Sequence, residues 1–342
     1  MTSGSGGVAR AALLLGLSVL ACATGDTGRP GWQAWQRGDH TAALAELVPR
    51  AEAGDVEAQM LLAQIHLDGG GVPVDEAEAA RYYRMAADAG VLHARYALGL
   101  LTESGRGVPR DDGQAAHWYA LAAEGGHAGA QHRLGMLLLE GRGVERDDAQ
   151  AVRLLEAAAE HGRADAQLVL AELYARGHGV ERDEAIAVHW YRRAAEQGLA
   201  AAQTALGQAY LTGAGVPADA TEAATWFYRA AEQGHAVARA NFGLLLLKGQ
   251  GVVQDFAEAA RWTALAADQG LPDAMNRLGT MYELGRGVEA DPVAAWQWYT
   301  LAAERGLDAA AGRRDLLAAT LSEQQLADAA AAVAAWNAAH GR

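Results

Sequence analysis

The sequence of 342 residues contains a single cysteine, Cys22, and a single lysine, Lys248, and it has few basic residues, 28 against 42 acidic ones. One cysteine excludes a disulfide framework and a cysteine-based zinc site within the chain. The net charge of −14 argues against a nucleic acid or an anionic membrane surface as the main partner. Intrinsic disorder over most of the length is also excluded, because 51% of the residues are hydrophobic.

Long hydrophobic runs are missing too, and the nearest approach to one lies at the N-terminus. Residues 11–21 (AALLLGLSVLA) are too few to span a bilayer, but they fit the hydrophobic region of a secretory signal. Two cleavage sites compete. The sequence ACA at residues 21–23 suits ordinary signal peptidase, and VLAC at residues 19–22 resembles a bacterial lipobox, in which Cys22 would carry the lipid. The sequence therefore predicts a periplasmic protein or an outer-membrane lipoprotein, with lipidation at Cys22 as the open alternative.

A 36-residue period organises the rest of the chain. The tetrad Gly-x-Gly-Val begins at Gly69, Gly105, Gly141, Gly177, Gly213, Gly249 and Gly285. An aspartate follows each valine by three residues, at Asp75, Asp111, Asp147, Asp183, Asp219, Asp255 and Asp291. A second glycine series recurs at Gly90, Gly126, Gly162, Gly198, Gly234, Gly270 and Gly306. Because aspartate favours helix N-termini and glycine favours the position after a helix, each repeat is predicted to be helix A, a glycine turn, helix B and a short turn.

Two columns of residues indicate how the predicted helices pack. Helix B carries an alanine at Ala79, Ala115, Ala151, Ala187, Ala223, Ala259 and Ala295. Three residues later comes a large side chain at Tyr82, Trp118, Leu154, Trp190, Trp226, Trp262 and Trp298. The unbroken alanine column indicates that a neighbouring backbone approaches closely. The aromatic column has two interpretations, a ladder on which a ligand stacks or the core between repeats, and we favour the core.

The pattern resembles the Sel1-like repeat, a relative of the tetratricopeptide repeat. The resemblance rests on stretches such as GHGVERD at residues 177–183 and HWYRRAAEQG at residues 189–198, and it extends over about residues 39–312. It implies an all-α fold, a right-handed α-solenoid of antiparallel helix pairs. It also implies a protein-binding or scaffolding role, often in the bacterial envelope or in signalling. The expected division of the chain is a signal in 1–23, a flexible tether in 24–30, N-terminal capping helices in 31–54, seven repeats in 55–306 and C-terminal capping helices in 307–342.

The partner-binding surface is predicted on one face of helix A. With the first alanine of each helix A at 0° and 100° per residue, the apolar columns at positions +4 and +7 fall on one side. The opposite side holds columns at +2, +3 and +6 whose residues vary from repeat to repeat, as in a recognition groove. The candidate partner-binding residues on it are Tyr96, His132, Arg133, Glu172, Asn241, Asn276 and Arg277. A merely solvated face is the alternative.

The sequence shows no pattern typical of an active site. No His-Glu-x-x-His pair, no Gly-Lys-Ser/Thr after a glycine tetrad and no Gly-x-Ser-x-Gly elbow occurs. We therefore expect no catalytic residues, no metal and no cofactor, and a monomer that binds a protein or peptide partner but no nucleic acid. A membrane would be contacted only through the possible lipid anchor. Two other functions stay open: a cell-wall enzyme such as a β-lactam or peptidoglycan hydrolase, and a structural stabiliser without a dedicated ligand.

Overall fold

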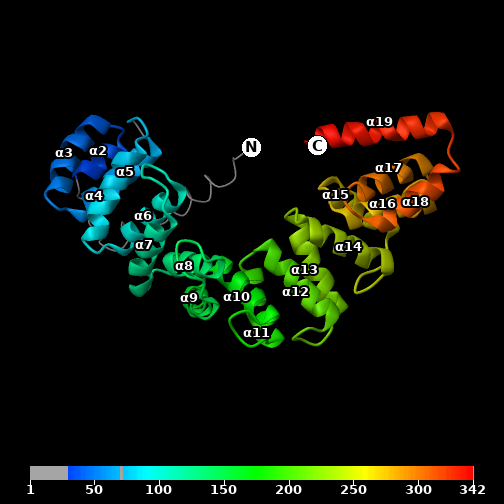
Figure 1. The fold of residues 1–342 in the computed structure, drawn as a ribbon, viewed down its shortest axis with the longest axis horizontal. Helices are drawn as coiled ribbons and strands as arrows, with labels where there is room; N and C mark the ends of the chain where they lie inside the picture. The colour runs from blue at the N-terminus through cyan, green and yellow to red at the C-terminus, as the bar shows by residue number, and fades with distance from the viewer. Residues whose placement is uncertain (1–29, 70–71, 342) are drawn as a thin grey trace. The chain divides into compact units, whose positions relative to one another are not determined.

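The computed structural model describes residues 30–69 and 72–341, and every regular element in these ranges is an α-helix (Figure 1). The segment that contains Cys22 and the predicted signal lies outside the described residues. The helices divide into two compact units, one of residues up to 173 together with 177–181, the other of residues 174–176 and 182 onwards. The helix α10 (Ala164–Arg176) is shared between them.

The first unit holds α2 (Pro30–Gln36), α3 (His40–Glu52), α4 (Val56–Asp68), α5 (Glu76–Asp88), α6 (Leu92–Ser104), α7 (Asp112–Glu124), α8 (Ala128–Glu140) and α9 (Asp148–Glu160). The second holds α11 (Glu184–Glu196), α12 (Ala200–Thr212), α13 (Ala220–Glu232), α14 (Ala236–Lys248), α15 (Phe256–Asp268), α16 (Pro272–Leu284), α17 (Pro292–Ala303), α18 (Asp308–Ala318) and α19 (Glu323–Ala339). Within each unit, consecutive helices pack in pairs, and each pair stacks on the next. This is the predicted α-solenoid architecture, with helix A in the even-numbered helices α4–α16 and helix B in the odd-numbered helices α5–α17.

The recurrent aspartate begins helix B in all seven repeats, as predicted. In α11, one carboxylate oxygen of Asp183 accepts hydrogen bonds from the backbone amides of Ala185 and Ile186 at 2.9 and 3.0 Å. The other six aspartates also cap their helices: Asp75, Asp219 and Asp291 accept from two backbone amides each, and Asp111, Asp147 and Asp255 accept from one. Each cap satisfies backbone donors that the first helical turn leaves unpaired and contributes about 1 kcal/mol.

The glycine turn has a second role that the sequence did not reveal. Gly213 ends α12 with a left-handed φ of 75°, as expected for a helix C-terminus. Gly215, two residues later, is also left-handed, and a Cβ on it would lie 2.1 Å from the carbonyl oxygen of Glu184 at the start of α11. The second glycine of the turn therefore lets the turn of one repeat press against the helix B of the repeat before it. In five other repeats, Gly107, Gly143, Gly179, Gly251 and Gly287 lie equally close to the preceding helix B.

The core lies between the helices of successive pairs. The alanine column of helix B is fully buried, from Ala79 to Ala295. The tryptophans beside it are also packed, and the most exposed of the four in the middle repeats, Trp190, keeps only 9% of its surface. Their outer edges are covered by arginines, as where Arg229 lies 4.6 Å from the ring centre of Trp226. The aromatic column is therefore core, which confirms the favoured interpretation over a ligand-stacking ladder.

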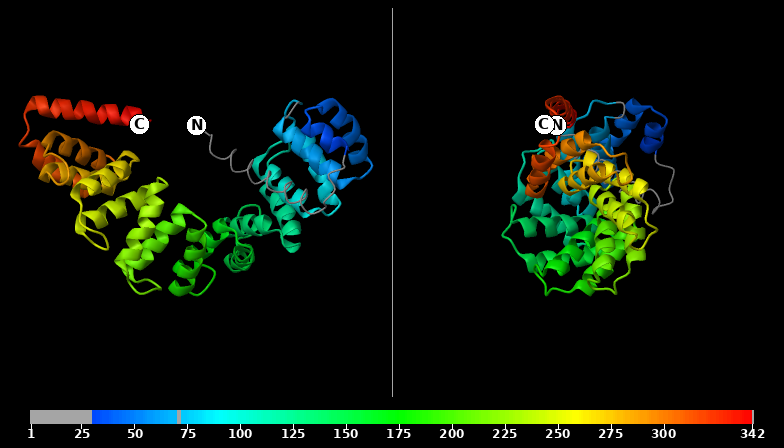
Figure 2. Two further views of the ribbon diagram at one scale, coloured as in Figure 1. Left: turned by 180° about the vertical axis from the view of Figure 1, so that it is seen from behind. Right: turned by 90° about the vertical axis from the view of Figure 1, so that its right-hand side faces the viewer.

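The last helix covers the end of the second unit. Ser322 and Gln325 form a capping box at the start of α19, the red helix of Figure 2, which packs against α17. Trp336 on α19 contacts Trp298 edge to face with their ring centres 6.5 Å apart, and Arg305 lies over its ring. Among the helices of 30–69 and 72–341, none has the length and apolar character that crossing a membrane requires.

Candidate functional site

In the first unit, the predicted site residue Arg133 on α8 is held by other residues of the chain. Its guanidinium donates two hydrogen bonds to one carboxylate oxygen of Glu103, which is 8% exposed at the end of α6. The same oxygen accepts the hydroxyl of Tyr119 on α7 at 2.7 Å. Burial, reinforced by the Glu103 charge, raises the pKa of Tyr119. We call Glu103, Tyr119 and Arg133 the polar triad of this repeat.

The predicted residues Tyr96 and His132 are largely buried beside this triad. Tyr96 is 6% exposed, and its ring lies 4.5 Å from that of His127. His132 is 9% exposed, with Nδ1 3.6 Å from a carboxylate oxygen of Asp165. Burial lowers the pKa of both histidines, that of His127 to about 4, so both are neutral at pH 7. Glu172 is half-buried on α10. A partner of the first unit would therefore meet a surface whose polar groups are already packed together.

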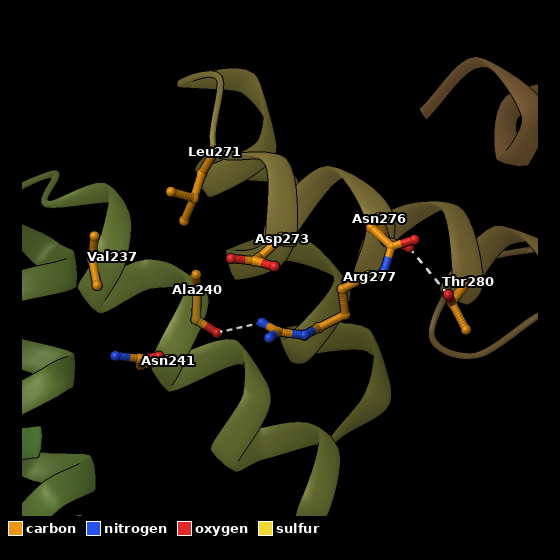
Figure 3. A pocket seen from close by; sticks show the side chains of 8 residues that line it. All are labelled: Val237, Ala240, Asn241, Leu271, Asp273, Asn276, Arg277 and Thr280. Carbon is orange, nitrogen blue, oxygen red and sulfur yellow. Dashed lines mark hydrogen bonds between the residues drawn. The ribbon is translucent and has the colours of Figure 1, made fainter. Parts of the chain in front are cut away.

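In the second unit, three predicted residues meet in one pocket of about 440 Å³, shown in Figure 3. Asn241 comes from α14, and Asn276 and Arg277 come from α16, the next helix A. The rest of the lining is Val237, Ala240, Leu271, Asp273 and Thr280. We call this cavity the α14–α16 pocket. The helical periodicity explains the meeting, because positions +2 and +3 after the first alanine of helix A point to the same side in every repeat.

The polar groups of the α14–α16 pocket are only partly satisfied by the protein. Arg277 donates from Nη1 to the backbone carbonyl of Ala240 at 2.7 Å. Burial lowers the pKa of Arg277, an effect that the carboxylate of Asp273 opposes. The side-chain oxygen of Asn276 is buried and has no hydrogen-bond partner among the described residues. Thr280 donates to the backbone carbonyl of Asn276 at 3.1 Å. The pocket thus offers a cation to a ligand, while the oxygen of Asn276 is enclosed by the protein.

The sequence reasoning missed the residues that precede the first alanine of helix A. Asp273 lies one position before Ala274, and Leu271 lies three positions before it, yet both line the pocket. At 100° per residue, position −1 falls near 260°, on the same side as the variable columns. Extending the helical wheel backwards by one residue would therefore have found Asp273, and with it the negative charge of the pocket.

In the part of the chain that the structure describes, no three His, Cys, Asp or Glu side chains gather where they could hold a metal ion. The α14–α16 pocket instead combines an arginine, two asparagines and a carboxylate with the apolar side chains of Val237 and Leu271. Amide and guanidinium groups bind by hydrogen bonding, and apolar walls bind by contact. The lining of this pocket therefore combines hydrogen-bonding and apolar groups.

Comparison with known proteins agrees with the repeat architecture. The Sel1 repeat model matches seven times, at residues 56–91, 92–127, 128–162, 164–199, 200–235, 236–271 and 272–307. A Sel1 repeat protein from Oxalobacter formigenes is 35% identical, with a TM-score of 0.65 over 90% of this chain and 86% of its own. A protective antigen of uropathogenic Escherichia coli strains that displays an SLR fold is 27% identical, with a TM-score of 0.51 over 87% of each chain.

A search of the curated proteins gave no match. Proteins built from Sel1 repeats are generally non-catalytic scaffolds for protein–protein interaction, so the fold itself suggests a protein partner. The family model covers most of the chain, and the same 36-residue helix pairs are present in the structure. The chain therefore belongs to the Sel1 repeat family.

Proposed function

We propose that the protein is a non-enzymatic adaptor of the bacterial cell envelope that binds a protein or peptide partner on its helix-A face. The observation that carries the proposal is the α14–α16 pocket, where the half-buried Arg277 forms no ion pair with any described residue and lies beside Asn241 and Asn276. Buried polar groups without partners cost free energy, so a site that retains them gains when a ligand supplies the missing hydrogen bonds. Helix pairs also hold such a site in place before binding, which lowers the entropy lost on association.

The proposed envelope location is supported by the N-terminal sequence. Residues 11–21 have the length and composition of a secretory signal, and Cys22 occupies the position that a lipobox requires. An adaptor exported in this way would act in the periplasm or at the outer membrane. We further propose that it works as a monomer, with any membrane contact made through a lipid on Cys22.

Photo-crosslinking in the cells that make the protein tests the proposal. A photoreactive amino acid is placed at Asn241 or Asn276 in the pocket, and at Thr225, an exposed residue of helix B in the same unit, as the matched control. We expect the same partner to be captured from both pocket positions and not from Thr225. Capture that is equal from Thr225, or absent from both pocket positions, would reject the helix-A face as the binding surface.

A further inference from the structure

Three arginines lie three residues after an alanine of the same 36-residue column, two of them on helix A and one on α18, which follows the last repeat in the same register. They are Arg133 on α8, Arg277 on α16 and Arg313 on α18. Since they share a register position, their guanidinium groups start from equivalent places on equivalent helices. They differ in whether a glutamate of the chain pairs with the guanidinium.

Two of these arginines pair with a glutamate of the preceding helix A. Arg133 binds Glu103, which also accepts the hydroxyl of Tyr119. Five repeats later the arrangement recurs: Arg313 lies 3.3 Å from a carboxylate oxygen of Glu283, which accepts the hydroxyl of Tyr299 at 2.5 Å. In both polar triads the glutamate stands 30 residues before its arginine. The glutamate is therefore the built-in partner of this arginine position.

Around Arg277, the two positions equivalent to the glutamate and the tyrosine of the polar triad hold other residues. Leu247 stands where the glutamate would be, and Thr263 stands where the tyrosine would be. Thr263 is fully buried, and its hydroxyl has no hydrogen-bond partner in the described ranges. Arg277 forms no ion pair within 4.0 Å with any residue that the structure describes, and its one hydrogen bond goes to the backbone of Ala240. Arg277 therefore has no counterpart of the glutamate that pairs with Arg133 and with Arg313.

We propose that a partner supplies this missing acid: Arg277 binds the side-chain carboxylate of an aspartate or glutamate in an extended segment of the partner protein. The proposal rests on the helix-A adaptor function and names the chemistry that the site recognises. A guanidinium presents parallel donors that match a carboxylate, and the partial burial of Arg277 strengthens the attraction. The side-chain amide nitrogen of Asn276, which lines the same pocket, then donates to a backbone carbonyl of the same segment, which a bare carboxylate does not offer.

Asp273 sets the limits of this recognition. Its carboxylate lines the same pocket, and Figure 3 shows it directed toward α14, as the guanidinium of Arg277 is. The pocket holds one cation and one anion, so Asp273 offsets part of the attraction of Arg277 for any anion, and only an oxygen close to the guanidinium gains net energy. The overall charge of −14 adds a long-range repulsion of acidic partners, which physiological salt screens beyond about 8 Å. We therefore infer a short-range contact with a single carboxylate.

The proposal is tested by measuring the binding of three acetylated tripeptides to the full-length ¹⁵N-labelled protein in 150 mM salt. Acetyl-Ala-Glu-Ala-amide carries a side-chain carboxylate, acetyl-Ala-Gln-Ala-amide carries none, and acetyl-Ala-Ala-Ala carries only a terminal carboxylate. Binding is followed by the shifts of the Nε–H signal of Arg277 and the side-chain amide of Asn276. We expect the Glu peptide to bind at least tenfold tighter than the Gln peptide and the free-terminus peptide. Equal binding of the Glu and Gln peptides, tighter binding of the free-terminus peptide, or no saturation with any peptide overturns the proposal.

Variants assign the effect to the missing acid. Leu247→Glu recreates the spacing of Glu103 and Arg133. The new glutamate should form an ion pair with Arg277 and lower the affinity for the Glu peptide at least tenfold. Arg277→Gln should abolish the preference for Glu over Gln. Asp273→Asn should raise the affinity for the Glu peptide about threefold, because the substitution removes one repelling charge. Arg182→Gln, a control at an exposed arginine outside the pocket in the same unit, should change nothing.

Leu247→Glu or Arg277→Gln with wild-type peptide preference would refute the role of Arg277. Folding of each variant is checked by far-ultraviolet circular dichroism, and Asp273→Asn, at an exposed position, provides an independent readout should Leu247→Glu not fold. The crosslinking experiment makes no use of carboxylate chemistry. Capture of a partner at the pocket without preference for the Glu peptide would overturn this inference and leave the adaptor function supported. Preference for the Glu peptide without capture of a partner would support the carboxylate site and contradict the adaptor function.

Discussion

The substitution Gly215→Ala tests how neighbouring repeats are joined. The new Cβ would lie 2.1 Å from the carbonyl oxygen of Glu184, a backbone atom that cannot move without displacing the start of α11. Forcing such a contact typically costs about 1–3 kcal/mol. Holding alanine in the left-handed conformation costs roughly 1–2 kcal/mol, and the lower entropy of the unfolded chain returns about 0.4–1 kcal/mol. We expect the free energy of unfolding to fall by about 2–4 kcal/mol.

Gly198→Ala, at the end of α11 in the repeat before, is the matched control. Gly198 is also left-handed, with φ of 90°, but a Cβ on it would meet no atom within 4 Å. Only the backbone cost applies there, so the loss should be about 1 kcal/mol or less. The difference between the two variants isolates the contact between the turn and the preceding helix B.

Urea unfolding of the full chain, followed by circular dichroism at 222 nm, measures both losses. Repeat arrays can unfold in more than one step, so the midpoint of the first transition is compared and hydrogen exchange locates it. Gly215→Ala should raise the exchange rates of the first amides that α11 protects, and Gly198→Ala should not. If the two variants lose equal stability within about 0.5 kcal/mol, the close approach of the turn to Glu184 does not hold the repeats together.

Three further predictions concern the core, the buried histidines and the N-terminus. Trp226→Ala should destabilise the protein by about 3–5 kcal/mol in urea unfolding, because it empties a buried site between repeats; a loss below 1 kcal/mol would contradict its place in the core. Burial holds the pKa of His127 near 4 in the folded state, below the 6.5 of an unfolded chain, so the unfolded state binds the extra proton. Stability should therefore be fully present above pH 6.5 and be lost as the pH falls toward 4, and His127→Gln should flatten this dependence; an unchanged slope would refute the assignment. Cys22→Ala should abolish labelling of the protein by a radioactive fatty acid in cells; equal labelling of the variant, or none of the wild type, would exclude lipidation at Cys22.

Much of the fold could be predicted because its signals are local and repeated. A capping aspartate acts within three residues of itself, and a left-handed glycine acts at its own position, so seven copies at a 36-residue spacing specify helix boundaries without tertiary information. The alanine column also follows from the sequence, because a small residue kept in every repeat indicates close packing. The Sel1 resemblance then supplied the way in which the helix pairs stack.

The candidate site was harder to predict because it depends on pairs of residues from different repeats. The helical wheel placed Asn241, Asn276 and Arg277 on one face, and the structure brings these three together in a pocket. The same wheel placed Arg133 on that face but could not show that Glu103 already binds it. Whether either group contacts a partner stays a prediction.

The sequence by itself determined the period, the helices and the identity of the buried columns, because these depend on propensities and spacings within a single repeat. The tertiary structure decided which polar side chains are satisfied and which are not. Arg133 and Arg277 occupy the same position of the repeat, yet only the packing of adjacent helices shows that one meets Glu103 and the other the backbone of Ala240. The physical reason is that burial and ion pairing arise between repeats, across 30 residues or more, where the chemistry of one position depends on a neighbour that the local pattern does not specify.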